Sequence, residues 1–210
     1  MELLKKFLEN ELNLPYERFS DKFENYSRLL LEWNQKINLI SRKLSSIEPN
    51  ILTSLYFLKK LPLKGNEKIF DIGTGAGFTG IPLKILYSHI EITLNDSIGK
   101  KILVVDDIIS KLNLRGAKAV TGRAEELAKD DKYKKKYDIV ISKAVADIDK
   151  LWQWGSGLLK RDSKMIFLKG GDLNEELTTF KNKFPELKYY VEEFSFPEEY
   201  KIEDKKIIII

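Results

Sequence analysis

From residue 68 onward, short apolar runs alternate with amphipathic stretches, and this alternation limits the possible folds more than any other feature of the sequence. Seven runs have the length of a strand: residues 68–72, 90–94, 117–120, 138–142, 165–168, 189–194 and 206–210. The helical stretches between them are residues 78–87, 100–112, 147–158 and 175–184. Repeated strand–helix–strand units predict an α/β fold with a doubly wound, mostly parallel sheet. The continuous run Ile139-Val140-Ile141 is typical of a strand that is buried on both faces.

Residues 1–64 have a different pattern, which predicts helices and no strand. A first short helix ends before Pro15, Ser20 can cap a second helix, and a third covers about 48–60. We therefore divide the chain into an N-terminal helical cap, residues 1–64, and a ligand-binding sheet domain, residues 65–210. No low-complexity linker separates the two, so we expect one compact unit.

Composition excludes several kinds of chemistry. The 210 residues include no cysteine and one histidine, His89, so thiolate nucleophiles and disulfides are excluded and we expect no metal centre. No apolar run reaches the ~18 residues of a membrane span, and the N-terminus lacks the pattern of a signal peptide, so we expect a cytoplasmic protein. The net charge is +4, and the densest basic stretch contains Lys132, Lys134, Lys135 and Lys136. That stretch is either a solvated turn or a patch that contacts phosphate groups.

The first predicted strand continues directly into a glycine-rich turn, DIGTGAGF at residues 71–78. Glycine permits a tight turn and a close approach of the backbone to a ligand. In sheets of this kind, ligands bind outside the carboxyl ends of the strands. A dinucleotide fingerprint would need glycine at position 78, and the phosphate-binding G-x-x-x-x-G-K-[ST] motif is absent. The turn therefore predicts a ligand without a pyrophosphate, and S-adenosylmethionine is such a ligand. The residues that we assign to it here are Asp71, Gly73, Gly75 and Gly77.

Further candidate residues follow the next two strands and so lie on the same rim of the sheet. Asp96 follows the second strand, where nucleotide sites place a carboxylate that accepts hydrogen bonds from ribose hydroxyls. After the third strand, Ala124 and Glu125 combine a small residue with an acid, which would admit a flat adenine and bind its amino group. In this order on successive strand ends, these residues predict a nucleotide-type site.

Five segments resemble the GidB/RsmG family of bacterial guanine-N7 methyltransferases that act on small-subunit ribosomal RNA. They are LLLEWNQKINLIS, DIGTGAGFTGIPLKI, LNDSIGKK, GRAEEL and SKAVA, and the resemblance extends from about residue 29 to residue 169. It implies a seven-strand, Rossmann-like methyltransferase sheet with an N-terminal helical cap. It also implies S-adenosylmethionine as methyl donor and a guanine in the decoding-region loop of 16S rRNA as acceptor. By position, the cofactor contacts that it implies are Gly73, Phe78, Ala124, Glu125 and Lys143, with Asp96 on the ribose.

The chain also departs from the family pattern. The family usually has arginine at Lys143 and at Lys205, and proline at Thr79. Its usual His-x-x-Asp-Ser is replaced here by Asn50-Ile51-Leu52-Thr53-Ser54. These departures leave the cofactor loop intact and concern the acceptor and the rate of transfer.

The residues that are missing bear on the reaction. The Asn/Asp-Pro-Pro-aromatic loop that is common among amino-group methyltransferases is replaced by Ser142-Lys143-Ala144-Val145, and methylation of pyrimidine C5 needs a cysteine. Guanine N7 needs neither, because its lone pair is already nucleophilic and carries no proton. We therefore assign no general base and give Lys143 an electrostatic role. The residues expected to contact RNA are Lys100, Arg123, Lys169 and Lys205, together with Lys143.

Two other functions remain open. One is a methyltransferase for a small molecule or a protein, with the helical cap as a lid, and it predicts a closed apolar acceptor pocket. The other is a catalytically silent module that only binds the cofactor. We expect the small ribosomal subunit or its RNA as partner and a monomeric protein.

Overall fold

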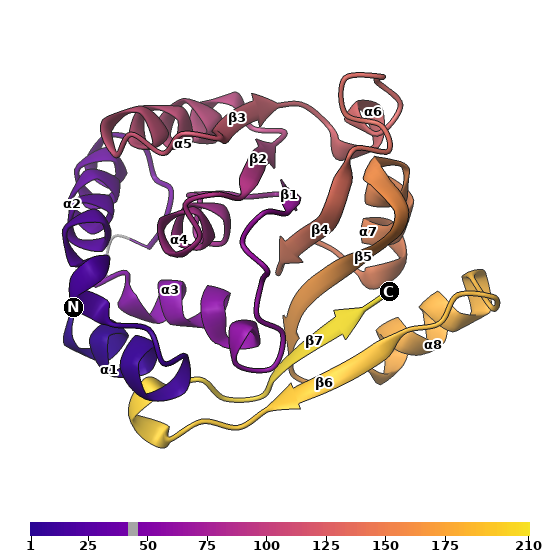
Figure 1. The fold of residues 1–210 in the computed structure, drawn as a ribbon. Helices are drawn as coiled ribbons and strands as arrows, with labels where there is room; N and C mark the ends of the chain where they lie inside the picture. Colours follow the sequence, from indigo (N-terminus) through magenta and orange to yellow (C-terminus); the bar gives the residue numbers. More distant parts are fainter. Residues whose placement is uncertain (42–45) are drawn as a thin grey trace.

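The computed structural model describes residues 1–41 and 46–210 (Figure 1). Its helices are α1 (Glu2–Glu11), α2 (Ser20–Lys36), α3 (Glu48–Leu55), α4 (Gly80–Leu86), α5 (Gly99–Lys111), α6 (Ala124–Leu127), α7 (Ile148–Gly155) and α8 (Asn174–Lys183). Its strands are β1 (Lys68–Ile72), β2 (Glu91–Asp96), β3 (Ala117–Thr121), β4 (Tyr137–Lys143), β5 (Leu159–Gly170), β6 (Tyr190–Phe194) and β7 (Lys205–Ile209).

The seven strands form one sheet in the order β3-β2-β1-β4-β5-β7-β6. All neighbours are parallel except β7, which is antiparallel to both β5 and β6. The predicted fold class, a mostly parallel, doubly wound sheet with helices, is therefore confirmed. The strand order reverses between β1 and β4, and this is the point at which such sheets bind their ligands.

Several elements differ from the prediction, most clearly β5, α3 and α6. β5 begins six residues earlier than expected, because Leu159 already pairs with Tyr137 before a register shift in the ladder. α3 ends at Leu55, and residues 56–59 continue as a 3₁₀ turn. The short helix α6 was not predicted, because four residues carry too little periodicity to indicate a helix.

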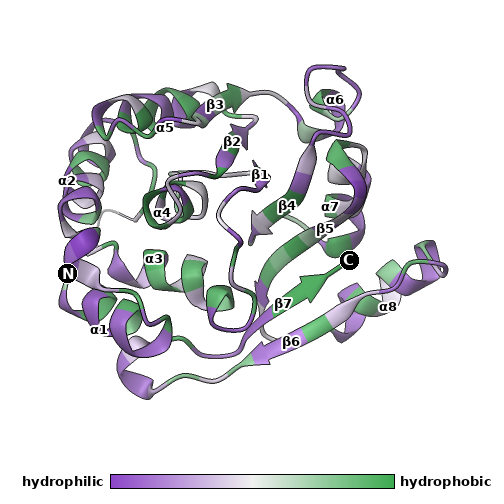
Figure 2. Cartoon of the chain, viewed as in Figure 1, coloured by the Kyte–Doolittle hydropathy of each residue, from purple (hydrophilic) through white to green (hydrophobic). Residues whose placement is uncertain are grey.

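The continuous apolar runs fill two cores, one on each face of the sheet. Ile139 and Ile141 of β4 point to the core that contains α4, α5 and the N-terminal helices, whereas Val140 points to the core under α6, α7 and α8. This alternation explains why the central strands are apolar on both faces. Figure 2 shows hydrophobic residues along β5 and β7 and mixed polarity on the outer helices.

The N-terminal helices pack against the same face of the sheet as α4 and α5. Leu4 and Phe23 belong to the same apolar core as Ile69 of β1. The buried Tyr26 hydroxyl donates to the carbonyl of Ala76 in the glycine-rich turn at 3.2 Å, and Tyr56 donates to the carbonyl of Lys206 at 2.6 Å. Residues 1–64 therefore help to build the site. None of the described helices is long and apolar enough to cross a bilayer.

Candidate functional site

The glycine-rich turn between β1 and α4 has a backbone that suits only glycine at its key positions. Gly73, Gly75 and Gly77 have φ angles of +67°, +58° and +81°. A Cβ at Gly73 would lie 2.5 Å from Cγ2 of Val145, whereas one at Gly75 would have no atom closer than 3.9 Å. The turn therefore packs against the loop after β4 at one glycine and faces open space at the next. This geometry agrees with the predicted role of the turn in ligand approach.

Asp71 holds the turn from inside. It is 1% exposed, and its Oδ2 accepts hydrogen bonds from the Thr74 hydroxyl at 2.6 Å and from the Gly80 N–H at 3.1 Å. Burial raises its pKa to about 7, against these two hydrogen bonds and the charge of Lys143. Asp71 does not line the neighbouring cavity, so its contribution in this structure is to fix the backbone of the turn.

Asp96, at the end of β2, joins the turn to the start of α5. Its Oδ2 accepts the Gly75 N–H at 3.1 Å and lies 3.5 Å from Nζ of Lys101, while Oδ1 accepts the Ile98 N–H at 2.9 Å. A carboxylate has about four lone-pair sites, so acceptor capacity remains for ligand hydroxyls. The contact of Asp96 with a ribose stays a prediction, for which this carboxylate has free acceptor capacity.

A cavity of about 420 Å³ opens at the carboxyl ends of β1 to β4. Gly73, Asp96, Ala124, Glu125 and Lys143 line it, which brings together most of the residues predicted to bind the cofactor. The prediction did not include several other lining residues, which are Ile98, Lys101, Val145 and Trp154.

The apolar part of this lining is unusually open. Ile98 is 49% exposed and Val145 is 40% exposed, although both side chains are large and hydrophobic. In the sequence, Ile98 is an apolar residue two positions after the acid that ends β2, and this spacing is the signal that would have identified it. Apolar walls beside a carboxylate suit a ligand with a flat base and a ribose.

Lys143, the last residue of β4, separates this cavity from a second one of about 280 Å³. Its Nζ donates to the Ser54 hydroxyl at 2.7 Å and to the Asn50 carbonyl at 3.1 Å, and it lies 5.4 Å from the centre of the Phe78 ring. Burial lowers its pKa to about 8, although Asp71 opposes this shift. No carboxylate among the described residues forms an ion pair with it.

The second cavity lies between the helical cap and the carboxyl ends of β4 and β5. Thr53 and Tyr56 line it from the cap, and Lys143, Lys169 and Lys205 line it from the sheet. Three lysines thus stand among hydroxyl and apolar groups in its walls, which differs from the purely apolar pocket that a small-molecule acceptor predicts.

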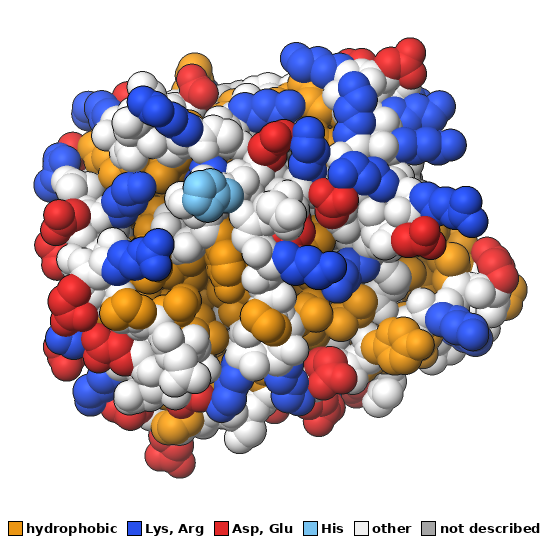
Figure 3. Space-filling model, viewed as in Figure 1, with side chains coloured by type: hydrophobic (Ala, Val, Ile, Leu, Met, Phe, Trp, Pro, Cys, Tyr) orange, Lys and Arg blue, Asp and Glu red, His pale blue; other side chains and the backbone are white. Residues whose placement is uncertain are grey.

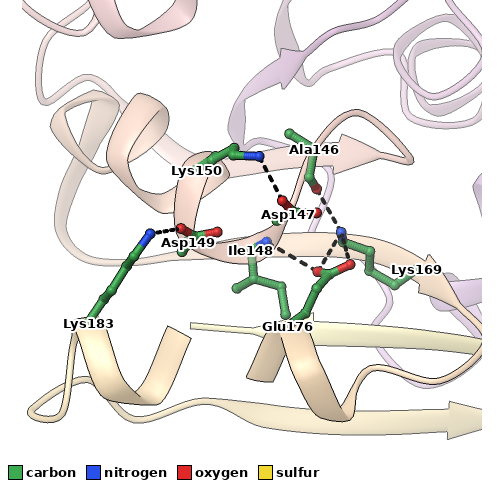
Figure 4. Close-up of polar contacts among 8 residues, drawn as sticks. All are labelled: Ala146, Asp147, Ile148, Asp149, Lys150, Lys169, Glu176 and Lys183. Carbon is green, nitrogen blue, oxygen red and sulfur yellow. Dashed lines mark hydrogen bonds and ion pairs between the residues drawn. The ribbon is translucent and has the colours of Figure 1, made fainter. Parts of the chain in front are cut away.

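Lys169 has a different environment from the one expected of an RNA contact. Its side chain is 9% exposed, and its Nζ donates to the Ala146 carbonyl at 2.7 Å and to both carboxylate oxygens of Glu176 (Figure 4). Glu176 also accepts the N–H of Ile148 at 3.2 Å, at the start of α7. The pair thereby holds both ends of the segment 146–148, next to Val145 and the glycine-rich turn.

The remaining predicted residues lie at three different places. Arg123 is exposed and lines the larger cavity, Lys205 lines the smaller one, and Lys100 is exposed on α5 but lines neither. Gly77 and Phe78 belong to the turn but not to the lining of either cavity. Among residues 1–41 and 46–210, no group of three or more His, Asp or Glu side chains is arranged to hold a metal ion.

Solved structures that superpose on this chain include methyltransferases. An O-methyltransferase from Bacillus cereus in complex with SAH superposes with a TM-score of 0.60 and 16% identity, covering 98% of this chain and 96% of that one. A precorrin-6y C5,15-methyltransferase from Geobacter metallireducens superposes with a TM-score of 0.57 and 18% identity, covering 81% and 90%. At such identities the likeness shows the fold alone. The fold and the site together place the chain in the class of S-adenosylmethionine-dependent methyltransferases.

Sequence comparison then gives the family. Residues 20–204 match the model described as rRNA small subunit methyltransferase G. Relatives called ribosomal RNA small subunit methyltransferase G are 42% identical in Mesoplasma florum and 39% identical in Thermoanaerobacter sp.. The matches cover 87% and 82% of this chain, and 77% and 73% of the relatives. The chain belongs to this family, and the resemblance found in the sequence is confirmed.

Proposed function

We propose that the protein transfers a methyl group from S-adenosylmethionine to N7 of a guanine in small-subunit ribosomal RNA. One observation carries the proposal: the larger cavity, which has the features of a nucleoside site, and the smaller basic cavity share Lys143 and Ala144 as their common wall. A donor in one cavity and an acceptor base in the other would therefore meet at the carboxyl end of β4. The larger cavity takes the donor because the glycine-rich turn and Asp96 border it.

Different residues of the larger cavity contact different parts of the donor. Asp96 accepts hydrogen bonds from ribose hydroxyls, Ile98 covers one face of the adenine, and Ala124 leaves room for its edge beside Glu125. The backbone of Gly73 and Gly75 approaches the methionine part, where a side chain would collide. When bound, the donor supplies an electrophilic methyl group on a sulfonium.

The residues of the smaller cavity suit an acceptor that needs no deprotonation. Its lining, drawn from the described residues, contains lysines, hydroxyl groups and apolar side chains but no carboxylate and no histidine. N7 of guanine carries no proton, so positioning and electrostatics are sufficient for transfer. Lys205 and Lys143 orient the RNA through its phosphates or the guanine O6 edge, because ammonium groups bind such acceptors as point charges.

The test uses radiolabelled S-adenosylmethionine and purified small ribosomal subunits, followed by mapping of the labelled nucleotide. Label on guanine N7 supports the proposal. Label on an exocyclic amino group, a protein or a small molecule contradicts the N7 assignment, and tight cofactor binding without any transfer indicates a silent binding module. Two variants check the division of the site. Lys205→Gln should raise KM for the subunits without changing the Kd of the cofactor, whereas Asp96→Asn should weaken cofactor binding first.

A further inference from the structure

A third cavity, of about 350 Å³, lies at the opposite end of the strands, where β1 to β4 begin. Four lysines line it, Lys68, Lys118, Lys132 and Lys136, together with a single acid, Glu91. In Figure 3, lysine and arginine side chains gather on the upper right of the molecule, where Figure 1 places α6 and the segment that leads into β4. This cavity is separate from the site of methyl transfer, and it includes part of the lysine-rich stretch noted in the sequence.

The cations of this cavity are poorly neutralised. Glu91 already forms an ion pair with Lys68 at 3.0 Å. Among the described residues, no ion pair involves Lys118, Lys132 or Lys136. Nearby acids have other roles, since Asp138 pairs with Lys160 at 2.8 Å. The lining thus carries four positive charges and one negative charge.

The lysines of this cavity lie near enough to Lys118 for their charges to act on it. The Nζ atoms of Lys118 and Lys132 both lie 5.3 Å from the centre of the Tyr133 ring. Burial lowers the pKa of Lys118, and the positive charges of Lys132, Lys136 and Lys68 lower it further. An anion bound in the cavity would relieve this repulsion.

A fifth ammonium group lies beneath the cavity floor. Lys84 is 3% exposed, and its Nζ donates to the carbonyls of Ser88 at 2.6 Å and Ile90 at 2.5 Å. It has no carboxylate partner among the described residues, and it lies 3.1 Å from the point where a Cβ of Gly116 would stand. Gly116 itself lines the cavity. A buried charge is screened less than an exposed one, so Lys84 adds to the positive potential at this floor.

We propose that this cavity binds phosphate groups of the RNA backbone and forms a second docking site for the ribosomal RNA substrate. It lies at the end of the strands opposite the methyl-transfer site. The inference rests on the proposed rRNA substrate. The two sites lie at opposite ends of the same strands, so the length of a strand separates them. The six residues of β2 span about 20 Å at ~3.3 Å per residue. Double-stranded RNA can contact a protein over such a distance, since domains that bind it through its backbone span about 16 base pairs.

The test compares the wild type with the triple variant Lys118→Gln, Lys132→Gln, Lys136→Gln. Binding of small subunits is measured by filter retention at several salt concentrations, without S-adenosylmethionine, and methyl transfer is measured separately. Each lost phosphate contact should lower the slope of log K against log salt by ~0.7–0.9, so the triple variant should lose about 2 to 3 from the slope. We expect its affinity for subunits to fall at least tenfold, with an unchanged Kd for S-adenosylmethionine as the sign of an intact fold.

A matched control removes the same charge elsewhere. Lys181, Lys188 and Lys201 are exposed lysines of the C-terminal region, and none of the three lines this cavity. An equal loss of affinity in the control variant, Lys181→Gln, Lys188→Gln, Lys201→Gln, would show a general effect of net charge and overturn the inference. Unchanged subunit binding in the first variant would also overturn the inference. This holds even if tripolyphosphate raises the Tm of the wild type but not that of the variant, because the cavity would then bind a free anion and not the RNA. Label at a position other than N7 would instead contradict the proposed reaction and leave the binding result valid.

Discussion

The charge of Lys143 should set the alkaline limit of methyl transfer. Its pKa is lowered to about 8, so the side chain is half charged near pH 8 and about one-tenth charged at pH 9. If the charged form holds the RNA, kcat/KM should fall about tenfold per pH unit above that value, because kcat/KM reports the pKa of the free enzyme. Lys143→Arg should remove this limit, since a guanidinium stays protonated throughout the range.

The assay follows kcat/KM for small subunits from pH 6.5 to 9.5, with calorimetric binding of S-adenosylmethionine as a parallel measurement. Titration of the RNA affects both enzymes equally, so the difference between Lys143 and Lys143→Arg isolates this side chain. An identical alkaline limit in the two proteins would refute the reasoning. Lys143→Met should lose transfer at all pH values while still binding the cofactor.

The same shift predicts how stability depends on pH. Burial disfavours the charged lysine, so the folded protein releases this proton at a lower pH than the unfolded chain does, whose pKa stays near 10.5. The free energy of unfolding of the wild type should therefore rise, relative to Lys143→Met, as pH increases from about 8 to 10.5. The difference of about 2.5 pKa units corresponds to about 3 kcal/mol at most.

Three further results are expected from single substitutions. Gly75→Val should abolish binding of S-adenosylmethionine in calorimetry, because a β-branched residue at φ +58° is strained and projects into open space beside the turn; unchanged affinity would contradict the role of this turn. Asp96→Asn loses charge-assisted hydrogen bonds worth ~1.5–3 kcal/mol, so the Kd should rise at least tenfold, and a 2′-deoxyribose analogue should bind the wild type poorly. Equal binding of the two ribose forms would argue against this contact. Glu176→Gln should raise the Kd several-fold by releasing the segment 146–148. Lys183→Met breaks the ion pair that joins α8 to Asp149 of α7 and should leave the Kd unchanged; a similar rise in both would assign the effect to helix packing.

Residues whose role depends on a short stretch of sequence could be predicted from the sequence. The glycine-rich turn and Asp96 each follow a buried strand directly, and parallel strands bring their carboxyl ends to one rim. The same rule placed Ala124 and Glu125 correctly at the larger cavity. The fold class followed for a similar reason, because runs of β-branched residues report burial on both faces.

Residues whose role depends on distant partners could not be predicted in this way. Lys169 occupies a strand end like Lys143, but its carboxylate partner Glu176 comes from a helix that the local pattern does not connect to it. The cap residue Ser54, 89 positions away, holds Lys143, and only the fold shows this contact. On α5, the residue that reaches Asp96 is Lys101 and not Lys100, because one step along a helix turns a side chain by about 100°.

The hydrogen bond from Tyr26 to Ala76 limits how enzymes of this type can change during evolution. A cap that merely covered a finished site could be exchanged for another cap to recruit a new acceptor. Here the cap contributes a buried hydroxyl to the backbone of the glycine-rich turn, so a replacement that lacks this donor leaves the Ala76 carbonyl without its partner and destabilises the turn. Change of acceptor is therefore more accessible through substitutions at the rim, as at Thr53 and Lys143, than through exchange of the whole cap.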